Sequence, residues 1–261
     1  MTRKVFLAWQ EPERRRWHPI GRLQTNGRRF VFVYTRGALE AQNAGCFTPL
    51  AAFPVLRRVY QSEKLFPLFA NRLMPSSRPD YRDFLGWLDV AEPDAAPLVI
   101  LARSGGQRAT DTLEVFPSPE KTTGGVYETR FFIHGLSHMP KESLQRAEQL
   151  KPGEPLLLMR DFQNPYDANA LALRTAESVP GDLHLLGYGP RYLCGELLKL
   201  MAASPDSPVV TVERVNLSPA PVQLRILCHL RMKWADGFAP FSGDEYQPII
   251  GDDKADSRRV A

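Results

Sequence analysis

The chain is poor in cysteine, because Cys46, Cys194 and Cys228 are the only three among its 261 residues. None stands in a Cys-x-x-Cys pair, and three thiols cannot all pair internally, so we expect reduced cysteines. No apolar run approaches the length of a membrane span, and nothing at the N-terminus resembles a signal peptide. These absences together predict a soluble, cytoplasmic protein.

Catalytic and metal-binding motifs are also missing. Gly105-Gly106 is too short for a phosphate loop and precedes a predicted strand instead of opening a helix. No nucleophile elbow or triad signature is present, and no paired carboxylates can be assigned to acid–base work. His134 and His138 lie four residues apart without further ligands at a suitable spacing. We therefore expect no enzyme activity, no cofactor and no metal site.

What is present is typical of a globular protein with many turns. Hydrophobic residues make up 43% and charged residues 24% of the sequence. The length suits one large domain or two ordinary ones. The 23 prolines argue for short strands and turns and against a helical bundle. The formal net charge of +4 permits a polyanionic partner without demanding one.

The first 117 residues predict a β-rich module with short helices. Asn26-Gly27 is a strong hairpin signal between two strand-like segments. Arg14-Arg15-Arg16 is expected at a solvated hairpin tip, with phosphate contact as the functional alternative. The predicted strands are 5–8, 17–24, 28–34, 56–60 and 111–116, and the predicted helices are 37–43, 65–74, one opening at Pro79, and 97–103.

A Pro- and Gly-rich linker, residues 118–126, separates this module from a second one at 127–236. From Gly237 the pattern is lost, so 237–261 is expected to be an irregular tail. The fold class that follows is α+β in two modules. The second module is predicted to have strands at 127–135, 154–160, 170–173, 185–189, 209–215 and 222–232, a helix from Pro190 to Met201, and a helical or irregular segment at 141–150.

The most informative stretch is Arg160 to Leu173, which predicts strand, tight turn and strand. Pro165 fixes its own φ and drives the residue before it out of the helical region. The turn then places an aromatic ring, Tyr166, beside a carboxylate, Asp167. A tyrosine packed over its own turn and an aspartate that caps it is the simpler interpretation, because Asn, Asp and Pro are ordinary turn residues. Presentation of both groups to a ligand is the alternative.

Three blocks of the second module resemble the HIRAN domain. They are Phe-Phe-Ile-His-Gly-Leu-Ser-His at 131–138, the run from Leu158 to Ala170 around Asn-Pro-Tyr-Asp, and Leu-Gly-Tyr-Gly-Pro-Arg-Tyr at 186–192. The resemblance implies a small OB-like β-barrel that captures the 3′ end of single-stranded DNA. It further implies that Tyr166 stacks on the terminal base and that Asp167 bonds the 3′-hydroxyl.

The same resemblance suggests roles for further residues of this module. Arg191 matches a basic position that reaches backbone phosphate, and Tyr188 matches a polar position that lines the pocket. After the first strand the DNA-binding relative has an Arg and a Tyr, where this chain has Ser137 and His138. His138 can still stack, but a cation and a ring are lost. Arg160, Arg130 or Lys141 would have to supply part of that charge.

The first module resembles, more distantly, the N-terminal subdomain of HipA-type kinase toxins. The shared layout is a Gly-containing hairpin at 21–34, a Phe/Asn/Leu helix at 66–73, and a Gly-Gly turn before a strand at 105–116. No kinase catalytic-loop or metal-binding motif follows, so kinase activity is not implied. The resemblance implies a surface for contact with a protein partner.

Together these features predict a nucleic-acid-binding protein that takes single-stranded DNA by its 3′-hydroxyl end, in DNA repair or processing. The alternative is a regulatory protein without catalysis, whose barrel no longer binds DNA and whose partner is a nuclease, a helicase or a HipA-like kinase. Ser137 and His138 are the feature that favours this alternative.

Overall fold

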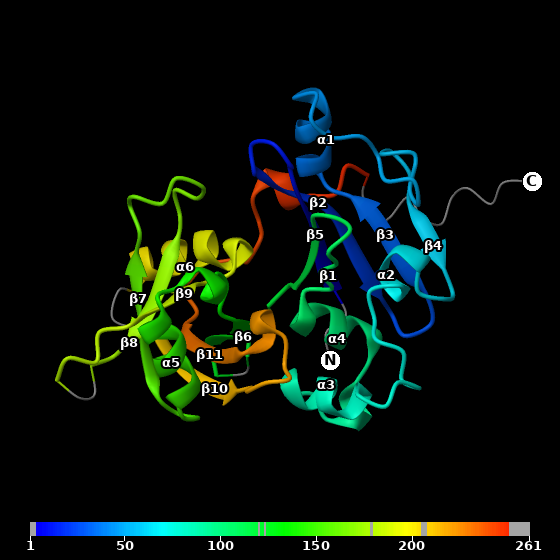
Figure 1. The fold of residues 1–261 in the computed structure, drawn as a ribbon. Helices are drawn as coiled ribbons and strands as arrows, with labels where there is room; N and C mark the ends of the chain where they lie inside the picture. Colours follow the sequence, from blue (N-terminus) through cyan, green and yellow to red (C-terminus); the bar gives the residue numbers. More distant parts are fainter. Residues whose placement is uncertain (1–3, 120, 123, 178–179, 205–207, 251–261) are drawn as a thin grey trace, which may run out of the picture. The chain divides into compact units, whose positions relative to one another are not determined.

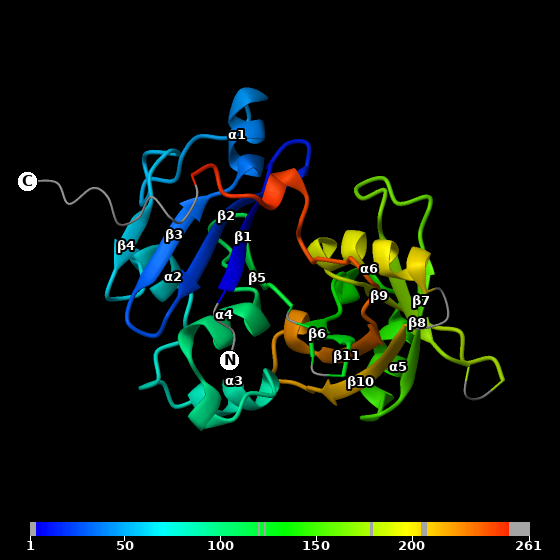
Figure 2. The same cartoon turned by 180° about the vertical axis from the view of Figure 1, so that it is seen from behind.

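The structure is a computed structural model that describes residues 4–119, 121–122, 124–177, 180–204 and 208–250. The chain divides into two compact units, which Figures 1 and 2 show from opposite sides. The first unit comprises residues 1–81, 92–118 and 241–261, and the second comprises 82–91 and 119–240. Among the described helices, none is long and apolar enough to cross a membrane.

The first unit is built on a five-stranded antiparallel sheet in the order β4-β3-β2-β1-β5. Its strands are β1 (Lys4–Gln10), β2 (Trp17–Thr25), β3 (Phe30–Tyr34), β4 (Tyr60–Ser62) and β5 (Leu113–Pro117). Its helices are α1 (Arg36–Asn43), α2 (Pro67–Ala70), α4 (Pro97–Ser104) and the 3₁₀ turns η1 (Glu92–Asp94) and η4 (Asp244–Tyr246).

One face of this sheet holds an aromatic core. Phe32 stacks on Phe53 with ring centroids 4.1 Å apart, and Phe69 packs beside them at 5.9 Å from Phe32. The hydroxyl of Tyr34 donates to the carbonyl of Phe53 at 2.8 Å and accepts from the N–H of Leu50. The core therefore satisfies its one buried phenol, and burial raises the pKa of that phenol well above its ordinary value.

The other face of the sheet is covered by the segment that follows the second unit. Phe241 and Tyr246 are 3% and 9% exposed, and both rings contact Phe6 of β1 at centroid distances of 5.4 Å. Phe116 of β5 completes the group. The sequence placed residues 237–261 in an irregular tail and did not predict this packing; residues from 241 to 250 belong to the first unit, and residues 251–261 lie outside the described part of the chain. Phe241 and Tyr246 are isolated aromatic residues, so the sequence around them has no hydrophobic periodicity that would predict their burial.

We expect Phe241→Ala to lower the free energy of unfolding by about 3–5 kcal/mol, as for other buried phenylalanines. Phe162→Ala, at a ring that is 79% exposed, is the matched control and should cost less than about 1 kcal/mol. Urea denaturation of the two variants beside the wild type measures both values. Equal, small losses would show that residues from 241 do not pack on the sheet.

The second unit holds a six-stranded antiparallel sheet in the order β6-β11-β10-β7-β8-β9. Its strands are β6 (Val126–Phe132), β7 (Pro155–Arg160), β8 (Leu171–Thr175), β9 (Leu185–Tyr188), β10 (Val209–Val215) and β11 (Ile226–Lys233). The remaining elements are α3 (Tyr81–Trp87, in this unit from Arg82), α5 (Lys141–Gln149), α6 (Arg191–Ala203) and the 3₁₀ turns η2 (Leu136–His138) and η3 (Val222–Leu224).

This sheet curls until its first and last strands meet. Immediately after β6, His134 exchanges two backbone hydrogen bonds with Tyr188 at the end of β9, at 2.8 and 2.9 Å. Gly187 makes the approach possible: its φ is +140°, and a Cβ there would lie 2.3 Å from the carbonyl oxygen of His134. The curled sheet agrees with the expected OB-like barrel, and the predicted α+β fold class in two modules is confirmed.

Most predicted elements are present, with two clear differences in the first unit. The strand expected at 56–60 lies instead at β4 (Tyr60–Ser62), and the helix expected at 65–74 is only the single turn α2 (Pro67–Ala70). Pro67 starts that turn, and the chain leaves it at Asn71 through successive turn hydrogen bonds. The apolar stripe was correct about burial of Phe69 but not about helix length.

We expect Gly187→Ala to destabilise the protein by at least about 1–3 kcal/mol, because the new methyl group meets a backbone carbonyl in a conformation that L-residues avoid. Gly195→Ala is the control, since that glycine lies inside α6 with nothing within 4 Å of its Cβ position. It should stabilise by up to about 1 kcal/mol. Thermal unfolding distinguishes them, and a neutral Gly187→Ala would mean that the strand closure is not tight.

Candidate nucleic-acid interface

The predicted turn joins β7 to β8, and its side chains hold its backbone. The side-chain oxygen of Asn164 accepts from the N–H groups of Tyr166 and Asp167 at 3.0 and 3.1 Å. Asp167 Oδ1 in turn accepts from the N–H of Asn169 at 2.9 Å. The loop closes where the N–H of Asp161 donates to the carbonyl of Ala170 at 3.0 Å. Asn and Asp thus fix the turn through local bonds, as their residue types predict.

The sequence left open whether Tyr166 and Asp167 only stabilise their own turn or are presented to a ligand, and the structure differs for the two residues. The ring of Tyr166 is 68% exposed, so it is not packed over its own turn. Asp167 does cap the turn through Oδ1, and its side chain is only 18% exposed. The turn therefore exposes an aromatic ring to solvent beside a carboxylate that already accepts a hydrogen bond from the backbone of the turn.

Arg191 ties this turn to α6. Its Nε lies 3.4 Å from Asp167 Oδ2, and one of its terminal nitrogens donates to the carbonyl of Tyr166 at 2.5 Å. Arg191 is the first residue of α6, at the end of the helix where the dipole favours an anion. A guanidinium, a helix N-terminus and an exposed ring thus meet at one place, which is the arrangement that phosphate and base binding require.

Tyr188 acts as a tie under the turn. Its hydroxyl donates to Asp161 Oδ2 at 2.9 Å, and its backbone makes the bridge that closes the sheet. Burial raises the pKa of Tyr188, and the hydrogen bond from its hydroxyl to the charged Asp161 adds to the shift. The hydroxyl therefore stays protonated and donates across the neutral range. Sequence reasoning placed Tyr188 here but gave Asp161 no role, because its partner comes from another strand.

Arg160 ends β7 and lies under a ring that the sequence prediction did not include. The Arg160 guanidinium carbon is 4.8 Å from the ring centroid of Phe162, and that ring is 79% exposed. The exposed ring offers a stacking face, and the cation beside it adds attraction for a stacked base. The available signal was a large apolar residue between the polar residues Asp161 and Gln163 in a loop.

His138 is the candidate residue that the structure leaves apart. It ends η2, its side chain is exposed, and in the described residues it makes no hydrogen bond or ion pair to the other five candidates. Of the cations expected to compensate for the lost arginine, Arg130 pairs with Glu213 at 3.2 Å instead. Lys141 is the first residue of α5. Arg160 is the one seen beside the turn.

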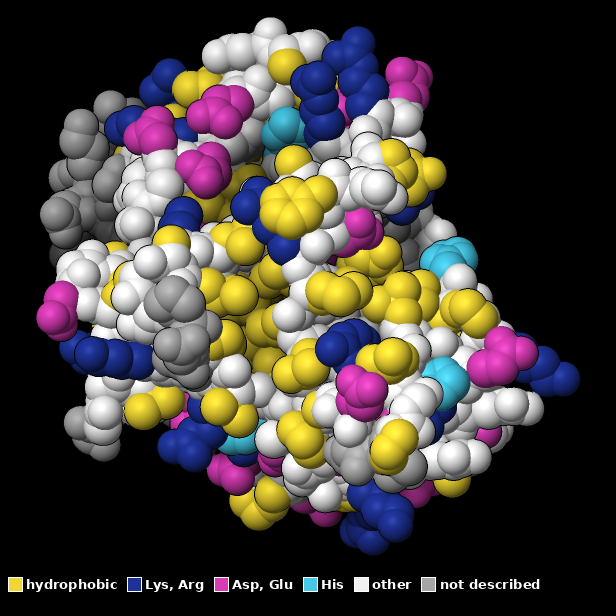
Figure 3. All heavy atoms as spheres, turned by 90° about the vertical axis from the view of Figure 1, so that its left-hand side faces the viewer, with side chains coloured by type: hydrophobic (Ala, Val, Ile, Leu, Met, Phe, Trp, Pro, Cys, Tyr) yellow, Lys and Arg dark blue, Asp and Glu magenta, His cyan; other side chains and the backbone are white. Residues whose placement is uncertain are grey.

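The surface around the hairpin has no strong charge of one sign. Figure 3 shows the side of the molecule on which β7 and β8 lie in Figure 1, and its exposed groups mix hydrophobic side chains with Lys, Arg, Asp and Glu. A broad electrostatic surface would need one sign of charge to dominate. Any binding here must therefore depend on the few specific groups at the turn.

The HIRAN domain family model matches residues 126–235. Those residues hold β6 to β11, the closing bridge and every candidate side chain described above. Residues 126–235 form a HIRAN domain. Such a domain suggests nucleic-acid binding, with single-stranded DNA as the ligand.

Two solved structures are similar to part of this chain. One is the HIRAN domain of human HLTF, with 20% identity over 42% of this chain and 81% of that one, at a TM-score of 0.31. The other is a protein from Lactobacillus plantarum, with 19% identity over 41% of this chain and 97% of that one, also at 0.31. No curated protein matches. The assignment rests on the family model, because similarity this weak carries no argument about function.

The HipA resemblance of the first 117 residues finds no support in these matches and stays a prediction. The six candidate residues of the HIRAN domain also stay predictions as ligand-binding groups. What the geometry adds is that four of them, Tyr166, Asp167, Arg191 and Tyr188, are linked through the β7–β8 turn.

We expect Tyr188→Phe to destabilise the HIRAN domain by about 1–3 kcal/mol, because it leaves the Asp161 carboxylate without its phenolic donor. Tyr166→Phe removes an exposed hydroxyl and should change stability by less than about 0.5 kcal/mol. Since the folded pKa of Tyr188 is raised, its contribution should be complete below its unfolded pKa and be lost only as pH rises through the folded value. Denaturant titrations from pH 7 upward test both expectations, which equal effects of the two variants would contradict.

Proposed function

We propose that the HIRAN domain of this protein binds the 3′-hydroxyl end of single-stranded DNA. The observation that supports this best is the exposed ring of Tyr166 directly beside the Asp167–Arg191 pair at the start of α6. The end of a DNA strand has a terminal base, a terminal hydroxyl and a phosphate. These three groups of the protein are suitable partners for those parts.

Tyr166 supplies the stacking face for the last base. Every base has a π-face, so stacking tolerates any sequence, which suits a protein that recognises an end. Stacking is worth about 1–3 kcal/mol per base, so loss of the ring corresponds to about 5- to 150-fold in affinity. The Phe162 ring over Arg160 provides a second platform on the same loop.

Asp167 and Arg191 supply the discrimination of the end. A carboxylate accepts a hydrogen bond from a 3′-hydroxyl but repels a 3′-phosphate, whereas the guanidinium and the first turn of α6 attract the phosphate that links the last two nucleotides. Because Asp167 Oδ1 is used by the turn, Oδ2 is the atom that receives the hydroxyl. A free hydroxyl end is therefore preferred.

The wider proposal is a binding protein without catalysis of its own, acting in the cytoplasm on DNA ends during repair or processing. Its first unit would then contact a protein partner. The second candidate function, a regulator whose barrel does not bind DNA, is favoured by Ser137 and His138. Both are exposed, and among the described residues their side chains make no hydrogen bond or ion pair to the other candidate residues. Loss of a cation at Ser137 and His138 predicts weaker DNA binding at the same site.

The experiment is fluorescence anisotropy with labelled single strands that end in a 3′-hydroxyl or a 3′-phosphate. Wild type should prefer the hydroxyl end. Tyr166→Ala should weaken binding to both ends by about 5- to 150-fold, because stacking does not depend on the terminal group. Asp167→Ala should remove the preference for the hydroxyl.

Two variants of the first unit serve as controls, Tyr60→Ala for the ring and Asp94→Ala for the carboxylate. Neither should change affinity. Binding indifferent to the end and to the site variants would contradict the proposal, as would no binding at low salt. Salt separates the two candidates: with the one phosphate contacted at Arg191, log K should fall with a slope of about −0.7 against log salt, whereas an apolar protein partner need show no such fall.

A further inference from the structure

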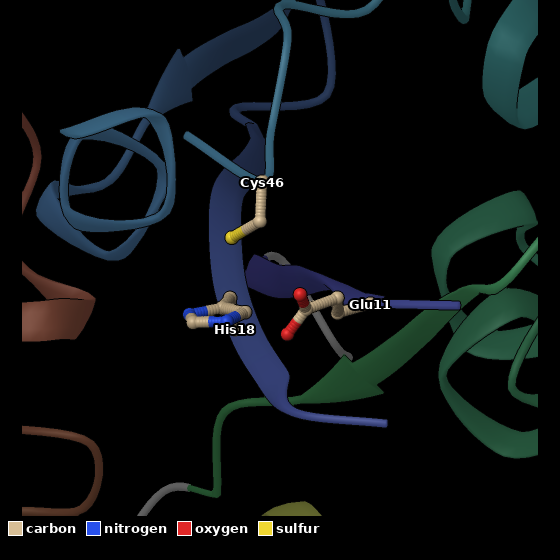
Figure 4. A group of neighbouring side chains, drawn as sticks. All are labelled: Glu11, His18 and Cys46. Atoms are coloured by element: carbon tan, nitrogen blue, oxygen red, sulfur yellow. The ribbon is translucent and has the colours of Figure 1, made fainter. Parts of the chain in front are cut away.

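Three potential metal ligands meet in the first unit, far from the HIRAN domain in the sequence. Glu11 follows β1, His18 lies in β2, and Cys46 lies just after α1. Their ligand atoms all lie within 4.8 Å of one another. Figure 4 shows the carboxylate of Glu11 and the thiol of Cys46 directed toward the imidazole of His18.

The local fold brings the three together for definite reasons. β1 and β2 pair with Trp9 opposite His18, and the N–H of Glu11 donates to the carbonyl of Arg16 at 2.8 Å, which closes the hairpin end. Cys46 follows Gly45, whose φ of +73° ends α1 with a left-handed turn. The end of the β1–β2 hairpin and the segment after α1, which lie apart in the sequence, therefore converge on one point.

Glu11 and His18 each also have one buried polar atom without a hydrogen-bond partner in the described residues. Glu11 is 7% exposed, yet its Oε2 is buried with no hydrogen-bond partner, and the same holds for Nε2 of His18. A buried, unpaired carboxylate oxygen is costly, and a buried unpaired atom on each of two clustered side chains calls for a shared ligand.

We propose that Glu11, His18 and Cys46 bind Zn²⁺. One sulfur, one nitrogen and one oxygen form a donor set that suits zinc, and three protein ligands leave a fourth tetrahedral position for water or another ligand. Zinc holds such atoms at about 2.0–2.3 Å, so small rotations of these side chains complete the geometry. The Cys46 thiol, which now donates to the carbonyl of Ala41 at 3.2 Å, would lose its proton on binding.

This proposal departs from the sequence expectation of no metal site. That expectation considered His134 and His138, which lie near each other in the sequence. The three ligands proposed here are spread over 36 positions and show no motif spacing, so only the fold brings them together. The ion would tie the end of the β1–β2 hairpin to the segment after α1 and stabilise the first unit.

The test is titration of the metal-free full chain with Co²⁺, which reports thiolate coordination through a charge-transfer band in the near ultraviolet. One equivalent should produce the band, and Zn²⁺ should displace it. Loss of even an outer-shell partner costs about 10- to 100-fold in metal affinity, so Cys46→Ser, His18→Asn and Glu11→Gln should each weaken binding at least tenfold. Cys46→Ser should abolish the band.

Glu13→Gln is the matched control, because this carboxylate lies on the same hairpin end and is exposed. It should bind Co²⁺ like the wild type. Circular dichroism without metal checks that each variant is folded, and Zn²⁺ should raise the Tm of the wild type but not that of Glu11→Gln. Absence of the band in wild type, or a band that survives Cys46→Ser, would overturn the proposal.

Discussion

The HIRAN domain depends on one close backbone contact, the pair of hydrogen bonds between His134 and Tyr188 that closes its curled sheet. Only a glycine before Tyr188 permits the two chains to approach, because a Cβ at 187 would collide with a carbonyl. The contact fixes the end of β9. That end places the Tyr188 hydroxyl against Asp161, and three residues later Arg191 begins α6.

The proposed DNA binding therefore depends first on how the strands are connected and only then on the exposed side chains. Tyr188 and Arg191 both hold the β7–β8 turn through hydrogen bonds, and the ring of Tyr166 is left exposed on it. A loop held in this way presents the ring at low cost in conformational entropy. The proposed preference for a DNA end needs that restraint, because discrimination of a single hydroxyl requires a carboxylate at a fixed place.

Local signals predicted the local features well. Asn164, Asp167 and Asn169 form the turn that their residue types indicate, and the alternation of β10 matched its observed bounds of Val209–Val215. Long-range features left no local signal. Asp161 finds its partner 27 residues away, and Phe241 packs on Phe6 across almost the whole chain. Neither contact alters the periodicity from which a strand or helix is predicted.

The position of Tyr166 next to a terminal base is the central claim, and a fluorescent base can report it directly. We would place 2-aminopurine at the last or at an internal position of an otherwise identical single strand with a 3′-hydroxyl, and measure its quenching on binding. The account predicts strong quenching at the terminal position, weak quenching inside, and loss of the terminal effect in Tyr166→Ala. Equal quenching at every position, unchanged in that variant, would contradict it.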